Sequence, residues 1–399
     1  MTKKVRLAIT ILILSEFLVC LGISLVIPVM PFLRNEYHFT ATDMGVMTSL
    51  FAFAQFAASP IIGRISDRAG RKPVLVIGLL LYMVSEIVFA WTNQLLFFNV
   101  SRIIGGLSAA MVVPTSMAMA ADITTKRQRA KVIGYLSAAF SGGLILGPGL
   151  GGILARIDYK FPFWAAAALG LLSMISLAIF LPKEEDLIPK EQIAKEVGPL
   201  VHRGKMKDIL TTAVVLLFAM ILISSFGLQG FESIYSLYVN QVFHFTMSDI
   251  ALVLTINGVL SLILQVVLFD RLVLAFQEKR VIRYAFLISL IGTLWIVLAH
   301  SKWEVVIATL FAFTAFDLLR PAITSLITKI SSGNQGFMNG LNMSLTSIGN
   351  IIGPIMSGEL LDMNPHYPYV VVAGFLAVSF LMTYLLRNTE ERVGATTDD

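Results

Sequence analysis

The sequence has little of what soluble proteins and most enzymes rely on. Only 14% of its 399 residues are charged, against about 25% in a typical soluble domain. Its single cysteine, Cys20, excludes an intramolecular disulfide. Five histidines fall in or beside predicted loops without paired spacing, and no serine–histidine–aspartate set can be argued. A phosphate-binding GxxxxGK[ST] segment is also missing. We therefore expect no metal, no cofactor, no use of ATP and no enzymatic activity.

Apolar residues, by contrast, make up 56% of the chain and gather in long runs. About 20 such residues suffice to cross a bilayer as a helix. A β-barrel would instead show short segments of alternating polarity. The sequence therefore predicts an all-α membrane protein. The twelve predicted spans cover residues 7–33, 43–66, 73–92, 96–121, 131–156, 161–182, 210–239, 247–269, 280–300, 303–328, 335–362 and 366–386.

The basic residues are distributed unequally between the two sides of this predicted bundle. With twelve spans, both termini lie on one side, and most of the 30 lysines and arginines fall there. The loops on the other side contain only Arg34, Arg156, Lys160 and Lys302. This asymmetry predicts a multi-pass protein of the cell membrane with both termini in the cytoplasm. It also explains the excess of basic residues without a nucleic-acid partner.

One long polar segment divides the chain into two similar halves. We predict an N-terminal six-helix bundle over residues 1–182, a cytoplasmic linker over 183–209 and a C-terminal six-helix bundle over 210–399. The fifth span carries Gly134, Gly143, Gly147 and Pro148, and the eleventh repeats this spacing at Gly340, Gly349, Gly353 and Pro354. Two repeated halves are typical of secondary transporters with a midplane site.

Several motifs give this architecture a family resemblance. The loop after the second span resembles the G-x-x-x-D-R-x-G-R-K signature of the major facilitator superfamily, and the region around Arg102 resembles its second motif. The glycines of the fifth span are similar to the superfamily's antiporter motif. The segments GISLVIPVMPF, FESIYSLY and FDLLRPAIT resemble the twelve-span drug/proton antiporters of Gram-positive bacteria, which export quinolones and other drugs.

The resemblance implies a fold and a function. The fold would be two six-helix bundles around a central cavity. The function would be proton-coupled export of lipophilic, often cationic or zwitterionic drugs by alternating access, by a monomer driven by the proton gradient. A transporter dedicated to one endogenous metabolite is an alternative that the sequence leaves open. A proton-driven importer fits less well, because the antiporter motif is not expected in symporters.

Six ionisable residues fall well inside the predicted spans. Each costs about 2.5–3.5 kcal/mol at the centre of a spanning helix, so each should face protein or a water-filled cavity. Glu232 shares one helix face with the polar residues Ser225, Gln229 and Ser236. Asp317 and Arg320, three residues apart, share one face of another helix. The resemblance implies that Glu232 and Asp317 couple protons. Of the two charge partners it implies, Arg320 belongs to Asp317, and Arg102 is a fixed organiser of the N-terminal half. A static Asp317–Arg320 ion pair is the competing interpretation. For Glu16 and Glu86 the sequence leaves a substrate contact and an interhelical hydrogen bond equally open.

The resemblance also implies positions for substrate contacts and for two conformational elements. The chain departs from relatives at Cys20 and Leu144, which leaves the substrate range open. The expected substrate contacts are Phe51, Gln55, Glu232, Tyr235, Phe313, Phe316, Thr346 and Asn350. The expected cytoplasmic gate consists of Gly63, Asp67, Arg68, Gly70, Arg71 and Lys72; plain anchoring by positive charge is its alternative. The antiporter motif, expected at the contact between the halves, consists of Gly134, Gly143, Gly147, Pro148 and Gly151.

Overall fold

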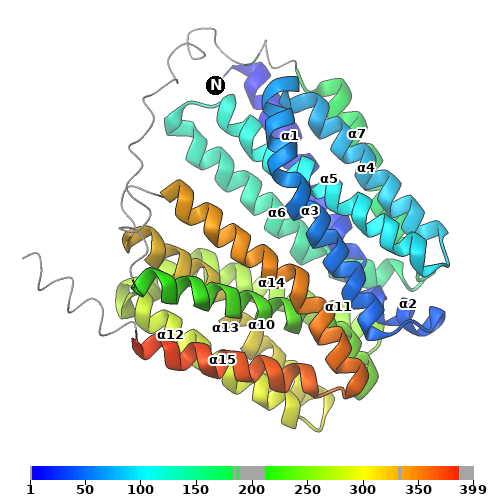
Figure 1. Cartoon of the computed structure of the whole chain (residues 1–399). Helices are drawn as coiled ribbons and strands as arrows, with labels where there is room; N and C mark the ends of the chain where they lie inside the picture. The colour runs from blue at the N-terminus through cyan, green and yellow to red at the C-terminus, as the bar shows by residue number, and fades with distance from the viewer. Residues whose placement is uncertain (1, 183–186, 188–211, 331–334, 386–399) are drawn as a thin grey trace, which may run out of the picture. The chain divides into compact units, whose positions relative to one another are not determined.

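The computed structural model describes residues 2–182, 187, 212–330 and 335–385. Nearly all of the predicted cytoplasmic linker lies outside these ranges. Within them the chain is helical and contains no strand (Figure 1). The first half forms α1 (Lys3–Leu25), η1 (Ile27–Val29), α2 (Met30–Tyr37), α3 (Ala41–Ala69), α4 (Arg71–Trp91), α5 (Leu95–Asp122), α6 (Lys126–Leu154) and α7 (Phe161–Phe180). The second half forms α10 (Thr212–Phe243), α11 (Met247–Ile263), the π-helical turn η3 (Leu264–Leu268), α12 (Phe269–Leu298), α13 (Lys302–Ile330), α14 (Gln335–Met363) and α15 (Tyr367–Leu385).

Helices occupy all twelve predicted spans. Eleven described stretches are long and apolar enough to cross a membrane, and the first runs from Lys3 to Tyr37 through α1, η1 and α2. The 3-10 turn η1 follows from Pro28 and Pro31, which lack the N–H groups that a continuous helix would use. α14 coincides with the predicted eleventh span but is not among the eleven. Its many glycines, serines and asparagines lower its apolar content.

The described chain forms two compact units, which differ slightly from the predicted halves. The first contains Met1–Phe39, Val46–Leu200 and Thr246–Thr255. The second contains Thr40–Gly45, Val201–Phe245 and Ile256–Asp399. The first turn of α3 therefore belongs to the second unit, and the first half of α11 belongs to the first.

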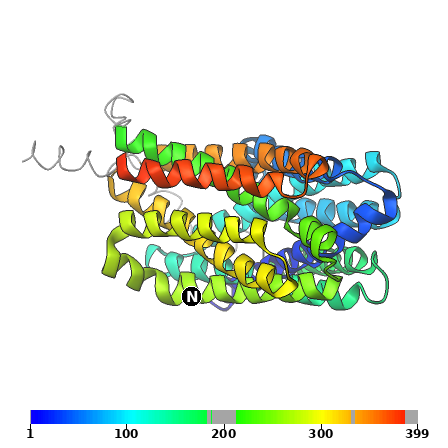
Figure 2. The same cartoon turned by 90° about the horizontal axis from the view of Figure 1, so that it is seen from below.

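The two units repeat one packing pattern. In the first unit, α4 packs against α5 and α7, and α1 packs against α6 and α7. In the second unit, α12 packs against α13 and α15, and α10 packs against α14 and α15 (Figure 1, Figure 2). The repeated glycine pattern of α6 and α14 is therefore part of a repeat that extends to the packing of whole helices.

The core of the first unit is an apolar cluster to which five helices contribute. α1, α4 and α5 supply Leu12, Leu79 and Met119, while Leu136 comes from α6 and Leu177 from α7; each is at most 1% exposed. Each of these side chains contributes about 1.5–3 kcal/mol when removed from water, although in lipid the gain comes from close packing instead.

Gln277, in α12, has a backbone conformation that only glycine adopts without strain. Its φ of 65° and ψ of 153° interrupt the helical backbone and bend the chain. A non-glycine residue in this region costs on the order of 1–3 kcal/mol. We predict that Gln277→Gly stabilises the protein by about 1 kcal/mol, after allowing for the freedom that glycine gains in the unfolded chain.

The measurement is the midpoint of thermal unfolding in detergent, which should rise for Gln277→Gly. Gln265→Gly is the matched control because Gln265 lies in the π-helical turn η3, with helical neighbours on both sides. There the same substitution should lower stability by about 1 kcal/mol. Two equal decreases would show that Gln277 carries no strain.

Candidate functional site

Two acids and one arginine come together in the second unit. The side chain of Glu232 is exposed on α10, and Asp317 and Arg320 of α13 lie within electrostatic reach of it. Asp317 is half-buried, with the hydroxyl of Ser261 from α11 beside it, while Arg320 is exposed. We call Glu232, Asp317 and Arg320 the charge cluster. With both acids ionised it contains two negative charges and one positive charge.

Asp317 and Arg320 of the charge cluster do not form an ion pair with each other. Among the described residues, ion pairs link Arg71 to Asp67 and Arg102 to Glu86, but none links Asp317 to Arg320. The three-residue spacing puts both side chains on one face of α13 without joining them. Arg320 can therefore compensate either acid of the cluster.

Three of the predicted substrate contacts are enclosed within the second unit. Tyr235, Phe313 and Phe316 are only 1–3% exposed. They surround Phe231, whose ring centroid lies 4.7 Å from that of Phe313 and 5.7 Å from that of Phe316. Tyr369 of α15 completes this cluster at 5.0 Å. Edge-to-face aromatic packing of this kind stabilises a core. In this conformation these rings offer a substrate no accessible surface.

The other predicted substrate contacts are accessible within their own units. Phe51 and Gln55 are half-buried on α3, where Phe51 lies against Gly105 of α5. Thr346 and Asn350 are half-buried on α14. These residues and the exposed Glu232 therefore present polar and aromatic surface that a substrate can contact.

Arg102 and Glu86 form a buried ion pair in the first unit. Arg102 Nη2 donates to Glu86 Oε1 over 3.2 Å, and their side chains are only 13% and 5% exposed. The guanidinium of Arg102 also lies 4.4 Å from the ring centroid of Phe89, a cation–π distance. The sequence left a substrate contact and an interhelical hydrogen bond open for Glu86. In the structure Glu86 makes the interhelical hydrogen bond, from α4 to Arg102 of α5. Sequence reasoning singled out both charges but did not pair them.

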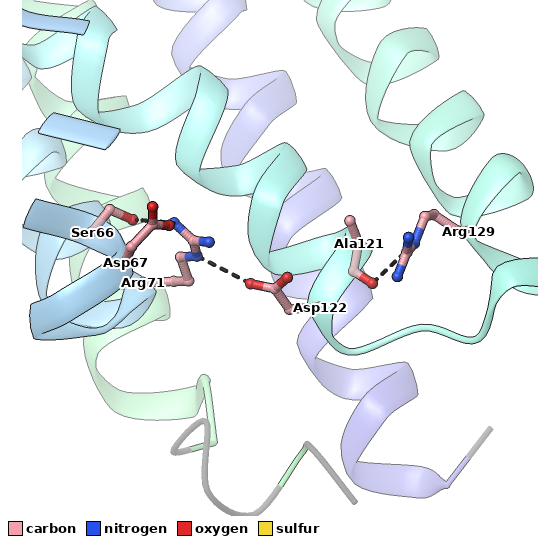
Figure 3. A network of polar contacts seen from close by, with 6 residues as sticks. All are labelled: Ser66, Asp67, Arg71, Ala121, Asp122 and Arg129. Carbon is pink, nitrogen blue, oxygen red and sulfur yellow. Dashed lines mark hydrogen bonds and ion pairs between the residues drawn. The ribbon is translucent and has the colours of Figure 1, made fainter. Parts of the chain in front are cut away.

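The predicted cytoplasmic gate is built around Arg71 (Figure 3). Its Nη1 lies 2.6 Å from a carboxylate oxygen of Asp67 and donates to Ser66 Oγ over 2.9 Å. Its Nε donates to Asp122 Oδ2, at the end of α5, over 3.1 Å. Gly70, with a φ of 93°, allows the tight turn that points Arg71 back toward α3. Ser66 and Asp122 are partners that sequence reasoning missed, although an acid at the end of a span was a usable signal.

The other residues of the predicted gate make fewer polar contacts than Arg71. Lys72 Nζ donates to the carbonyl of Leu181 over 2.5 Å, which ties the start of α4 to the end of α7. Gly63 and Arg68 are exposed on α3. Near Asp122, Arg129 Nε donates to the carbonyl of Ala121 over 3.1 Å (Figure 3). A cation at the C-terminus of α5 is favourable for the helix dipole.

The antiporter-motif glycines hold α6 tightly against α1. A side chain at Gly143, Gly147 or Gly151 would collide with α1, including Ser24 and the backbone of Leu25. Ser24 Oγ donates to the carbonyl of Gly143 over 3.0 Å, as a close approach of helices permits. The resemblance places this motif between the halves, but these three glycines pack within the first unit.

Gly151→Ala is expected to force α6 away from α1. The added methyl group would meet the backbone carbonyl of Leu25, which cannot rotate away. We predict a loss of about 1–3 kcal/mol in stability. Gly134→Ala is the matched control within the same motif, because its methyl group would meet nothing within 4 Å. Gly134→Ala should leave the stability unchanged or raise it by up to about 1 kcal/mol, because alanine has a higher helix propensity than glycine. Equal thermal unfolding midpoints for the two variants would contradict the close contact.

The motif's Pro148 lies within α6, a position that can kink a helix.

Comparisons with known proteins are consistent with this geometry. The sequence profile of the Major Facilitator Superfamily matches residues 12–269 and 217–398. Multidrug resistance protein 1 of Bacillus subtilis (strain 168) is 42% identical over 96% of this chain and 96% of its own. Quinolone resistance protein NorA of Staphylococcus aureus (strain MRSA252) is 35% identical over 91% of this chain and 92% of its own.

Solved structures show the same fold at lower identity. A bacterial homolog of the human lysosomal transporter Spinster, inward-facing and occupied, has a TM-score of 0.82 and 15% identity over 98% of both chains. A D-xylose-proton symporter has a TM-score of 0.76 and 16% identity, with 96% of this chain and 98% of that chain covered. Such identities establish the fold alone.

Proposed function

The chain belongs to the major facilitator superfamily, and we propose that it is a proton-coupled antiporter that exports lipophilic, often cationic or zwitterionic drugs. It is a multi-pass membrane protein. Relatives named for multidrug and quinolone resistance, aligned over nearly the whole chain, support the substrate class. We place it in the cell membrane as a monomer with cytoplasmic termini, and we assign it transport without enzymatic activity.

The charge cluster is the observation that carries this proposal. Arg320 can neutralise one of the two carboxylates of Glu232 and Asp317, but not both at once. One further positive charge brings the cluster to neutrality, and that charge can be a proton or a cationic substrate. Inside a membrane an uncompensated charge is costly. Proton and cation therefore compete for one place, which is the requirement for exchange.

Transport then follows from alternating access. Facing outward, the cluster takes a proton on Glu232 or Asp317, and the neutral cluster permits the protein to turn inward. A lipophilic cation arriving from the cytoplasm replaces the proton, which leaves to the inside. The cluster is neutral again, and the protein carries the cation outward. Within the second unit, the accessible side chains Thr346 and Asn350 contact the polar parts of the substrate.

The proton gradient is large enough for one proton to drive the export of a neutral substrate. One proton moving inward releases about 2.3 kcal/mol per 100 mV of membrane potential. A pH difference of one unit adds about 1.4 kcal/mol. Export of a neutral substrate against a hundredfold gradient needs about 2.7 kcal/mol. A single proton suffices for a neutral substrate, whereas a cationic substrate also opposes the membrane potential.

Reconstituted protein tests the proposal directly. Proteoliposomes containing the protein and a fluorescent lipophilic cation would be subjected to an imposed pH gradient. We expect counterflow of cation and protons that stops when an ionophore dissipates the gradient. Cation movement that is indifferent to the gradient would contradict antiport. Movement of a polar metabolite in place of the cation would favour the dedicated transporter.

A further inference from the structure

Glu16 is a buried acid in the first unit that the exchange at the charge cluster does not use. It lies in the middle of α1 and is only 1% exposed. Its surroundings are the apolar core cluster, with Leu12 and Val19 on its own helix and Met119 on α5. Ser116 of α5 provides the polar side chain that faces it. Within the described chain, neither carboxylate oxygen has a hydrogen-bond partner of normal geometry.

The cationic side chains that the structure describes on the helices packed against α1 are engaged elsewhere. Arg102 of α5 is paired with Glu86 of α4. On α6, Arg129 is bonded to a carbonyl, and Lys131 lies over an aromatic ring of its own helix. α7 carries no ionisable residue along its length. Among the described side chains, none of these cations pairs with Glu16.

The remaining ionisable side chains near α1 bring no positive charge to Glu16. Cys20 lies one helical turn away and is fully buried. Tyr82 of α4 places its hydroxyl against Gly22, farther along α1. The basic residues Lys3, Lys4 and Arg6 all lie within the first turns of α1. Among the side chains that the structure describes on α1 and on the helices packed against it, no cation is placed to compensate a Glu16 carboxylate.

From this isolation we propose that Glu16 is a further proton-binding site, located in the first unit and separate from the charge cluster. A carboxylate buried in an apolar core without a cation, and with only the hydroxyl of Ser116 facing it, is strongly disfavoured, so Glu16 holds a proton in this conformation. Because α1 packs against α5, α6 and α7, sliding of α1 during alternating access can bring Glu16 to water and release that proton. This inference rests on the proposed antiport and adds a proton to each cycle.

Infrared spectroscopy reads the protonation of Glu16 independently of transport. A protonated carboxylic acid has a carbonyl stretch that the carboxylate lacks. We expect this band in wild-type protein in the conformation described above, and we expect it to disappear in Glu16→Gln. Glu359→Gln, at an exposed site on α14, is the matched control and should leave the band unchanged. A wild-type spectrum without a band assignable to Glu16 would overturn the proposal.

The proton-to-substrate ratio gives the second test. It is measured in proteoliposomes by finding the imposed gradients at which net flux reverses. Glu16→Gln keeps the shape of the protonated acid, so it should fold and transport, but its ratio should be lower by one proton. An unchanged ratio together with an infrared band that persists at all pH values would overturn the proposal, because Glu16 would then be a permanently neutral packing group. Failure of antiport itself would appear in the wild type, and the infrared result would still decide whether Glu16 is protonated.

Discussion

Glu232→Gln is expected to abolish uphill export of lipophilic cations. Glutamine preserves the shape of the protonated acid but can neither release a proton nor compensate a cation. The charge cluster would then consist of Asp317 and Arg320 alone, which neutralise each other and leave no place for an added positive charge. We predict a loss of gradient-driven efflux by at least about tenfold, equivalent to at least about 1.4 kcal/mol of coupling.

The same assay separates the two acids of the cluster. Asp317→Asn also removes one negative charge from the cluster, so it should impair export to a similar degree if the acids act as one unit. Glu359→Gln serves as the control, since it removes an exposed acid of α14 that lies outside the cluster. Full export by Glu232→Gln would show that the place for the added charge is elsewhere.

The second large effect is expected on stability, at the buried ion pair of the first unit. Arg102→Met would leave the 5%-exposed Glu86 carboxylate without its cation. Removing one partner of a buried pair typically costs about 3–5 kcal/mol. The lost cation–π contact with Phe89 adds to this. We therefore predict a large decrease in the midpoint of thermal unfolding.

A double variant identifies the cause of this loss. Glu86→Gln combined with Arg102→Met removes both charges and should recover most of the stability, because no charge then remains buried. Arg280→Met, at an exposed site of α12, should change stability by at most about 0.5 kcal/mol. If the double variant were as unstable as the single one, the cost would come from packing and not from the charge.

The fold could be predicted from the sequence because a bilayer leaves few alternatives. Only helices satisfy the backbone within a single long apolar run, so the twelve spans followed from composition. The breaks within the spanning helices were harder to predict, because they depend on individual residues. Pro28 and Pro31 break the first span into three pieces, and Gln277 bends α12 without any sequence signal. The repeat was visible as glycine spacing, and the structure extends it to the packing of whole helices.

Contacts within the site were harder to predict, because they depend on which way each helix face turns. Helical spacing predicts a polar stripe that contains Glu232 and Ser236. Glu232 is exposed, whereas Ser236 is buried. Tyr235 lies next to the same stripe, yet it turns into the aromatic cluster around Phe231. Motif resemblance likewise located the glycines of α6 but not their packing partner, since α1 is distant in sequence.

The central claim is that a proton and a cationic substrate compete for the charge cluster. The most direct measurement adds tetraphenylphosphonium, a lipophilic cation, to purified protein in weakly buffered detergent solution and follows the pH. We predict that the wild-type protein releases a proton as the cation binds. The double variant Glu232→Gln with Asp317→Asn should release none from this cluster, and the difference between the two proteins isolates the cluster's proton. Binding of the cation to wild-type protein with no proton release, or equal release by both proteins, would contradict the account.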